Sequence, residues 1–281
     1  TPDVTSPMNA PPVSLARVKE LMSATYLKAR YATGVHKVAW VTSGAPVEVL
    51  QALGYVLIYP ENHAALCGAR KMGADLCQAA EDEGYSKDLC SYVRTDLGSI
   101  TTGKTPVGHL PPPDLLVCCT NICQTVKYWY EVLADHFGVP LVVIDTPFLY
   151  DEAHAHQVEY VQQQLEQELV PTAEKIAGRT LTDRDLRRTT DQAQAASRLW
   201  CAILERSQHR PAPMTAFDGF LLMGPIVAMR GLPETTSFYE RVLAEIVGVN
   251  DVVSDSILSV ELAPRERPHH AFVADVSLVA R

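Results

Sequence analysis

Basic runs and long apolar runs are both missing from this chain of 281 residues. The formal net charge is -9, and because lysine and arginine do not cluster, a nucleic-acid-binding surface is not expected. No apolar stretch reaches the roughly 20 residues of a transmembrane helix, so no membrane partner is expected either. The opening residues TPDVTSPMNAPP lack the basic and apolar parts of a secretory signal. We therefore expect a cytoplasmic protein.

A regular cysteine framework is missing as well. The seven cysteines are an odd number without the spacing of a small disulfide-stabilised scaffold, which favours a reducing compartment. What the chain does contain is 47% hydrophobic and 20% charged residues, a composition typical of a globular protein with an ample core. Its length fits one large domain or two ordinary ones.

Short apolar runs alternate with helical patterns in the first half of the chain. The expected strands are 37–43, 55–59, 114–119 and 140–145. Continuous apolar strands separated by helices indicate a parallel sheet covered on both faces. We therefore expect an α/β fold with a parallel-sheet flavodoxin-like or Rossmann-like domain, followed by a helical region and an incomplete second α/β domain.

The expected domains follow from the same pattern. An N-terminal lead and helix occupy 1–35, the α/β domain occupies 36–150, and the helical region with the partial second domain occupies 151–281. The tail contains a single strand candidate at 271–279, and one strand cannot form a sheet by itself.

Helix signals complete this outline. The expected helices span 15–31, 45–54, 64–82, 121–137 and 182–206. Near the end of the chain, Ser237 and Glu240 form a capping-box pattern that predicts a further helix from there to about 247.

Two cysteines stand where helices are expected to begin. Asp88 can cap one helix, which puts Cys90 in its first turn, and Thr120 or Asn121 can cap the next, which puts Cys123 in the same position. The partial positive charge of a helix N-terminus lowers the pKa of a nearby thiol, and thiolates bind metals and iron–sulfur clusters. The spacing allows a shared metal or cluster site; two buried apolar cysteines are the alternative.

Several other polar residues follow the expected strands. Ser43, Glu61 and Asp145 all fall at carboxyl ends, where parallel sheets bind their ligands. Either carboxylate can instead simply cap a following helix or turn.

One segment matches the phosphate-loop pattern. GSITTGKT (98–105) fits G-x-x-x-x-G-K-[ST] at every position. A phosphate loop needs a strand before it and a helix after it. Here the preceding SYVRTDL is expected to be helical, and four prolines in 106–113 exclude a following helix. We therefore expect 98–110 to be a loop that binds no nucleotide.

Several segments together resemble the benzoyl-CoA reductase and 2-hydroxyacyl-CoA dehydratase family. They are VTSGAPVEVLQALG (41–54), YPENHAALCGARKM (59–72), DLCSYVRTDLGS (88–99), GKTPVGHLPPPDLLVCCTNIC (103–123) and VVIDTPF (142–148). PMTAFDGFLLM (213–223) resembles the start of the family's second domain. Within the family, GKTPVG and CCTNIC look closest to small subunits of the ATP-dependent benzoyl-CoA reductases.

This resemblance implies a function. Family members are paired, related subunits, each with a [4Fe-4S] cluster beside a coenzyme A thioester, and a separate ATP-hydrolysing iron–sulfur activator injects a low-potential electron. Benzoyl-type enzymes reduce the aromatic ring to a cyclic diene, and dehydratases remove water from a 2-hydroxyacyl thioester through a ketyl radical. Three hypotheses follow: a benzoyl-CoA reductase-type subunit, a dehydratase subunit, and a non-catalytic partner of an active paralogue.

The resemblance also implies roles for single residues. Cys90 and Cys123 match the first two cluster cysteines, and Ser43 and Glu61 match positions near the thioester. Ser43 could hydrogen-bond the acyl oxygen, Glu61 could transfer a proton, and His63 is a further proton-donor candidate. In the family a third cluster cysteine comes from the second domain.

The chain departs from the family at that third position. Family members are considerably longer, and the only cysteine after Cys123 is Cys201, in an expected helix. No residue clearly fills the third position, so the chain is either truncated or a subunit whose cluster is lost or completed by a partner.

Overall fold

The computed structural model describes residues 12–209 and 212–254. Contacts divide the chain into two compact units, one comprising Thr1–Met22 with Arg187–Arg281 and the other Ser23–Leu186. We call them the helical unit and the sheet unit. The domain limits expected from the sequence stay a prediction.

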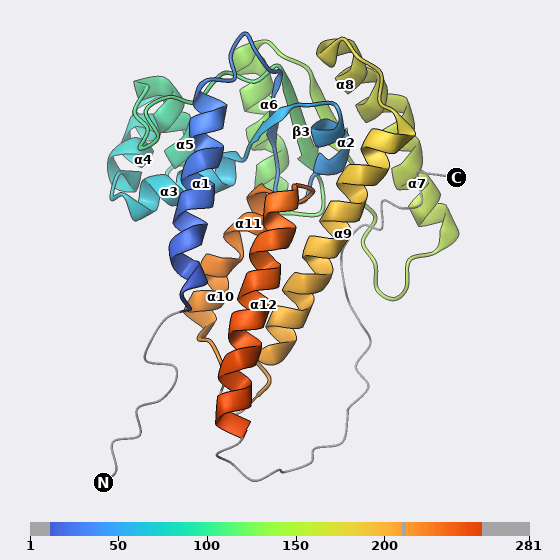
Figure 1. The fold of residues 1–281 in the computed structure, drawn as a ribbon. Coiled ribbons are helices and arrows are strands. Elements are labelled where there is room, and N and C mark those ends of the chain that lie inside the picture. Colours follow the sequence, from blue (N-terminus) through green and yellow to red (C-terminus); the bar gives the residue numbers. More distant parts are fainter. Residues whose placement is uncertain (1–11, 210–211, 255–281) are drawn as a thin grey trace. The chain divides into compact units, whose positions relative to one another are not determined.

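A four-stranded parallel sheet forms the centre of the sheet unit. Its strands are β1 (Val38–Val41), β2 (Val56–Ile58), β3 (Leu115–Cys119) and β4 (Leu141–Ile144), and they lie in the order β2-β1-β3-β4 (Figure 1). Every residue of β1, β2 and β3 is buried, which explains why these strands are continuous apolar runs in the sequence. The parallel α/β sheet is confirmed at the four expected places.

Helices lie between the strands and after the last of them. In chain order from the sheet unit's start they are α2 (Val47–Ala52), α3 (Pro60–Ala69), α4 (Gly73–Asp82), α5 (Ser91–Thr102), α6 (Gln124–Phe137), α7 (Ala155–Gln164), the π-helix η2 (Leu165–Leu169) and α8 (Val170–Ala177). The core combines the sheet with α5 and α6. Trp40 from β1 and Leu116 from β3 belong to the same buried cluster as Leu97, Trp129 and Leu133.

Three sequence-based boundaries are wrong. The helix expected over 64–82 is two helices, because Lys71 adopts a left-handed φ of 60° between α3 and α4. The expected loop 98–110 is helical as far as Thr102, where α5 ends before Gly103. The helix expected from Ser237 already begins at Pro233.

The helical unit contains α10 (Ala216–Leu222), α11 (Gly224–Ala228) and α12 (Pro233–Ser254). The helices α1 (Ser14–Arg30) and α9 (Asp183–Arg206) include the two points at which the units divide. From 145 onward, the described residues form no strand, and the candidate strand 271–279 lies outside them. The second α/β domain therefore stays a prediction.

Membrane contact can be judged only for the described helices. Within 12–209 and 212–254, none is both long and apolar enough to cross a bilayer.

Candidate functional site

Ser43 and Glu61 meet at the carboxyl edge of the sheet. Ser43 follows β1, and Glu61 lies in the first turn of α3, directly after β2. The Ser43 backbone N–H donates to Oε2 of Glu61 at 3.2 Å. Since β1 and β2 are neighbouring parallel strands, the residues that follow them emerge at the same edge. At this edge the Glu61 carboxylate therefore contacts the backbone of Ser43.

The loop before Cys123 lies against the same turn. Thr42 Oγ1 accepts the backbone N–H of Cys119 at 3.2 Å, which joins the end of β1 to the end of β3. A Cβ at Gly44 would come within 2.8 Å of the Asn121 side chain. The turn beside Ser43 thus contacts the loop that leads to Cys123.

Glu61 also acts electrostatically on Cys118 of β3. Burial and then the Glu61 carboxylate raise the pKa of the Cys118 thiol to about 12, and Cys123 acts in the same direction. Cys118 lies in the buried strand β3, so Glu61 and Cys123 both raise the pKa of a thiol in that strand.

Cys90 and Cys123 occupy equivalent positions in two helices. Each is the N-cap residue, Cys90 of α5 and Cys123 of α6, so capping by Asp88, Thr120 or Asn121 was a wrong prediction. Neither helix has a side-chain cap hydrogen bond at its start, and both thiols are free and exposed. The buried-core alternative is therefore excluded for these two cysteines.

The two thiols suit a thiolate-bound metal or cluster only in part. Soft sulfur donors at the positive ends of helices match the chemistry of a negatively charged iron–sulfur cluster. Among the residues that the structure describes, however, no three or more His, Cys, Asp or Glu side chains are grouped to hold a metal ion. Cys90 and Cys123 can thus supply only part of a ligand set. Cys201 is exposed on α9, in the helical unit.

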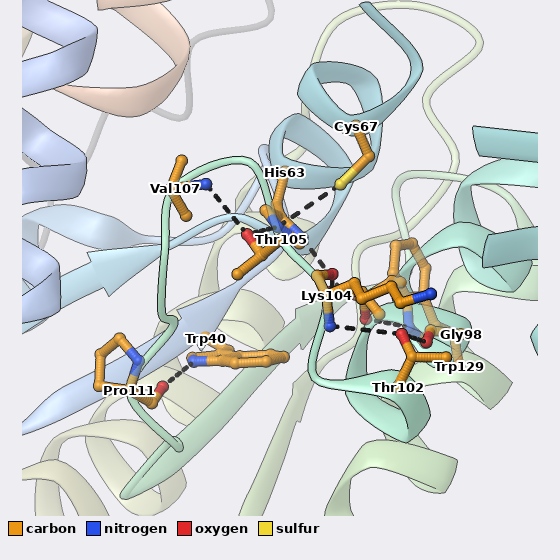
Figure 2. A network of polar contacts seen from close by, with 12 residues as sticks. Trp40, His63, Cys67, Gly98, Thr102, Lys104, Thr105, Val107, Pro111 and Trp129 are labelled. Carbon is orange, nitrogen blue, oxygen red and sulfur yellow. Dashed lines mark hydrogen bonds and ion pairs between the residues drawn. The ribbon is translucent and has the colours of Figure 1, made fainter. Parts of the chain in front are cut away.

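His63 is fully buried, whereas Ser43 and Glu61 are half-buried. Figure 2 shows the His63 side chain between Cys67 and Thr105. Nε2 lies 2.8 Å from Thr105 Oγ1 and 3.6 Å from Cys67 Sγ, and Nδ1 lies 3.7 Å from Asp96 Oδ1. The structure therefore does not bring His63 into hydrogen-bonding contact with Ser43 or Glu61.

Burial and a carboxylate act against each other at His63. Burial lowers its pKa, but the facing Asp96 and Cys67 side chains outweigh burial and raise the pKa to about 9. Burial also raises the pKa of Asp96, opposed by His63 and Trp129. Both shifts favour retention of a proton by the pair.

Asp145 has a structural role. Its carboxylate accepts hydrogen bonds from Thr120 Oγ1 at 2.7 Å and from the Tyr160 hydroxyl at 2.8 Å. These bonds, that of Thr120 first, lower its pKa. Its backbone also pairs with the Gln164 side chain. Asp145 thus joins the ends of β3 and β4 to α7.

The phosphate-loop pattern serves helix packing. Gly98 lies inside α5 where a Cβ would come within 1.9 Å of the Leu76 carbonyl oxygen, and Gly103 is the left-handed C-cap of α5. Ser99 Oγ then donates to the Lys104 carbonyl oxygen at 2.8 Å. The helix expected before the loop is confirmed, so the strand that a phosphate loop requires is not there.

Two features were not anticipated from the sequence. A groove of about 640 Å³ lies between α3, α4 and α5, lined by small residues such as Gly68, Gly73 and Ser91. The buried Asp96 accepts the Trp129 indole N–H at 3.0 Å. The sequence held no clear signal for this second feature, because Asp96 lies in a helix segment that also contains Thr95 and Ser99.

Comparisons with known proteins identify the family of this chain. The model of the family described as 2-hydroxyglutaryl-CoA dehydratase, D-component, matches residues 42–262. The chain is 36% identical over 211 residues to the (R)-2-hydroxyisocaproyl-CoA dehydratase alpha subunit of Clostridioides difficile, covering 74% of this chain and 52% of that protein. It is 36% identical over 210 residues to the lactoyl-CoA dehydratase alpha subunit of Anaerotignum propionicum, covering 69% and 50%.

A benzoyl-CoA reductase subunit is also among the relatives. Identity to a benzoyl-CoA reductase subunit of Thauera aromatica is 28% over 240 residues, covering 83% of this chain and 56% of that protein. The chain spans about half the length of the curated relatives it matches. The family resemblance is confirmed: the chain belongs to the 2-hydroxyglutaryl-CoA dehydratase D-component family, which includes 2-hydroxyacyl-CoA dehydratase and benzoyl-CoA reductase subunits.

Proposed function

We propose that this chain is a subunit of an enzyme that removes water from a 2-hydroxyacyl-CoA thioester. The observation that carries the proposal is the Ser43–Glu61 contact at the carboxyl edge of β1 and β2, beside the loop that leads to Cys123. Three dehydratase alpha subunits share 30–36% identity with it and a fourth shares 25%, against 28% for the reductase subunit. The three higher identities favour dehydration over ring reduction.

Dehydration removes the hydroxyl group from C2 and a proton from C3, so the site needs a group that exchanges protons with the substrate. Glu61 would be that group: its Oε2 is held by the Ser43 N–H, which orients the other carboxylate oxygen for a substrate proton. The Ser43 hydroxyl would donate to the thioester carbonyl oxygen and stabilise negative charge there.

Cys90 and Cys123 would provide two thiolate ligands of a [4Fe-4S] cluster, with the remaining ligands from outside the described residues. When bound, such a cluster supplies single-electron transfer. Helix N-termini beside both thiolates would offset part of its negative charge. A paralogous subunit and a separate ATP-hydrolysing iron–sulfur activator would be the partners, so ATP would bind to the activator.

A benzoyl-CoA reductase-type activity is the second candidate. The observation that favours it is the coverage of the reductase relative, 83% of this chain. A non-catalytic subunit is the third candidate, because the described residues hold an incomplete ligand set.

The test is an anaerobic assay of the chain with its partner subunit and activator, on a 2-hydroxyacyl-CoA and on benzoyl-CoA. We expect loss of water from the first substrate and no turnover of the second; the reverse pattern would establish the reductase. Protein that binds no iron in this complex would support the non-catalytic candidate.

The role of Glu61 is tested in the same assay. Glu61→Gln keeps the shape but cannot exchange a proton, so turnover should fall by roughly 10²–10⁴-fold while bound iron is unchanged. Glu83→Gln changes an exposed carboxylate at the end of α4 and is the matched control, which should leave turnover unchanged. Equal turnover in both variants would exclude Glu61 as the proton-transfer group.

A further inference from the structure

A single buried carboxylate connects three helices of the sheet unit. Asp96 lies in α5 and is fully buried. Its Oδ2 accepts the indole N–H of Trp129 from α6 at 3.0 Å. Its Oδ1 faces Nδ1 of His63 from α3 at 3.7 Å. Burying a carboxylate is costly, and apolar side chains would fill this core at lower cost, so the arrangement calls for an explanation.

The sequence positions of these contacts supply one. Asp96 follows the N-cap Cys90 by six residues (96 − 90), and Trp129 follows the N-cap Cys123 by six residues (129 − 123). The hydrogen bond therefore joins equivalent levels of the two helices, each about 9 Å along the helix axis from the N-cap cysteine. His63 in turn lies two residues after Glu61 on α3.

We propose that Asp96 is a positioning residue that fixes the register of α3, α5 and α6 and thereby holds Glu61, Cys90 and Cys123 at defined mutual distances. Asp96 acts through the helices and touches neither substrate nor cluster. The inference rests on the proposed function for the roles of those three residues, but the geometry that it claims can be measured without any activity.

The two links differ in strength. The Trp129 bond has the length of an ordinary hydrogen bond. The 3.7 Å between Asp96 Oδ1 and His63 Nδ1 is longer than a hydrogen bond, and among the described residues Oδ1 and Nδ1 have no hydrogen-bond partner. Asp96 therefore holds α6 more firmly than α3. Loss of the Trp129 bond should disturb the spacing of the two cysteines, while changes at His63 should leave that spacing intact.

The distance between the cysteines can be measured on the full chain by electron paramagnetic resonance, from the dipolar coupling between two spin labels. Spin labels are attached to the exposed Cys90 and Cys123 after replacement of Cys77 and Cys201 by serine, since the other cysteines are buried. With Asp96 intact we expect one narrow distance maximum. Asp96→Ala and Trp129→Phe should each lose that single maximum.

Conservative variants separate positioning from general destabilisation. Asp96→Asn retains an oxygen that can accept the Trp129 N–H, so it should restore the narrow maximum. His63→Gln should also keep it. If Asp96→Ala does not fold, Trp129→Phe removes the same bond from the other side and decides the question.

Tyr55→Phe is the matched control. It deletes another buried hydrogen bond of the sheet unit, from the Tyr55 hydroxyl to the Ala173 carbonyl oxygen at 2.7 Å, which involves neither α5 nor α6. The control should leave the distance distribution unchanged. The inference is overturned if Trp129→Phe keeps the narrow maximum, or if Tyr55→Phe broadens it equally.

A second readout connects the geometry to the site. After assembly in the anaerobic complex, the Asp96→Ala chain should carry less iron than the unmodified chain, and the Asp96→Asn chain should retain it. If the unmodified chain carries no iron, the proposed function fails, whereas the distance measurement still decides the role of Asp96.

Discussion

Replacement of Gly98 by alanine tests the packing of α5 on α4. In an exposed helix interior this change is favourable by up to about 1 kcal/mol, because glycine loses more backbone freedom than alanine on folding. At Gly98 the added Cβ would lie 1.9 Å from the Leu76 carbonyl oxygen and 2.7 Å from its carbonyl carbon. Both are backbone atoms, which no side-chain rotation can move away.

The magnitude follows from that distance. Ordinary van der Waals contact is roughly 3.5 Å, so the two helices must separate by about 1.5 Å at this point. Overpacking of a core typically costs about 1–3 kcal/mol and sometimes more, which exceeds the gain in helix propensity. We expect Gly98→Ala to destabilise the sheet unit by about 2 kcal/mol, and to lower its melting temperature by roughly 4–8 °C.

Gly68→Ala is the matched control. Gly68 lies in α3, and a Cβ there would meet nothing within 4 Å. The same chemical change should therefore be neutral or stabilising by up to about 1 kcal/mol. Urea unfolding is followed by the fluorescence of the buried Trp40 and Trp129, with Trp200 replaced by phenylalanine. If Gly98→Ala is as stable as Gly68→Ala, the close approach of α4 and α5 is refuted.

Three further predictions concern single side chains. Lys104→Ala should leave the ATP affinity of the isolated chain unchanged by calorimetry, and a loss of stoichiometric binding would revive the phosphate-loop hypothesis. Tyr160→Phe removes a hydrogen bond that helps to lower the pKa of Asp145. The variant should therefore have a lower free energy of unfolding than the unmodified protein above pH 3.8, the ordinary pKa of aspartate, and this difference should shrink as the pH falls below that value. A difference in urea unfolding that does not depend on pH would contradict this. Cys90→Ala should lose most of the iron that this chain itself carries after assembly in the anaerobic complex, and Cys77→Ala should keep it; equal iron on this chain in both variants would exclude Cys90 as a ligand.

The strands were predictable because burial on both faces leaves a direct mark on the sequence. All four appear as apolar runs, and because they are parallel, the residues that follow them lie at the same edge of the sheet. Ser43 and Glu61 could therefore be expected at one edge before their contact was seen. Local pattern was sufficient for these features.

Other features depend on tertiary packing or on unusual local conformations. The break between α3 and α4 occurs at Lys71, a residue type that rarely adopts a left-handed conformation. The N-caps are cysteines, whereas capping rules favour Ser, Thr, Asp and Asn. The pairing of Asp96 with Trp129 joins residues from two helices separated by β3, and no local pattern encodes it.

The strand order also has a consequence for synthesis on the ribosome. β1 pairs with β2 across 18 residues (Val38 with Val56), but with β3 across 76 residues (Ala39 with Leu115). At a synthesis rate of about 5–20 residues per second, roughly 4–15 s pass between the synthesis of β1 and that of its second neighbour β3. A ribosome that stalls before residue 115 would leave β1 with an open edge, a surface to which strands of neighbouring nascent chains can add and aggregate.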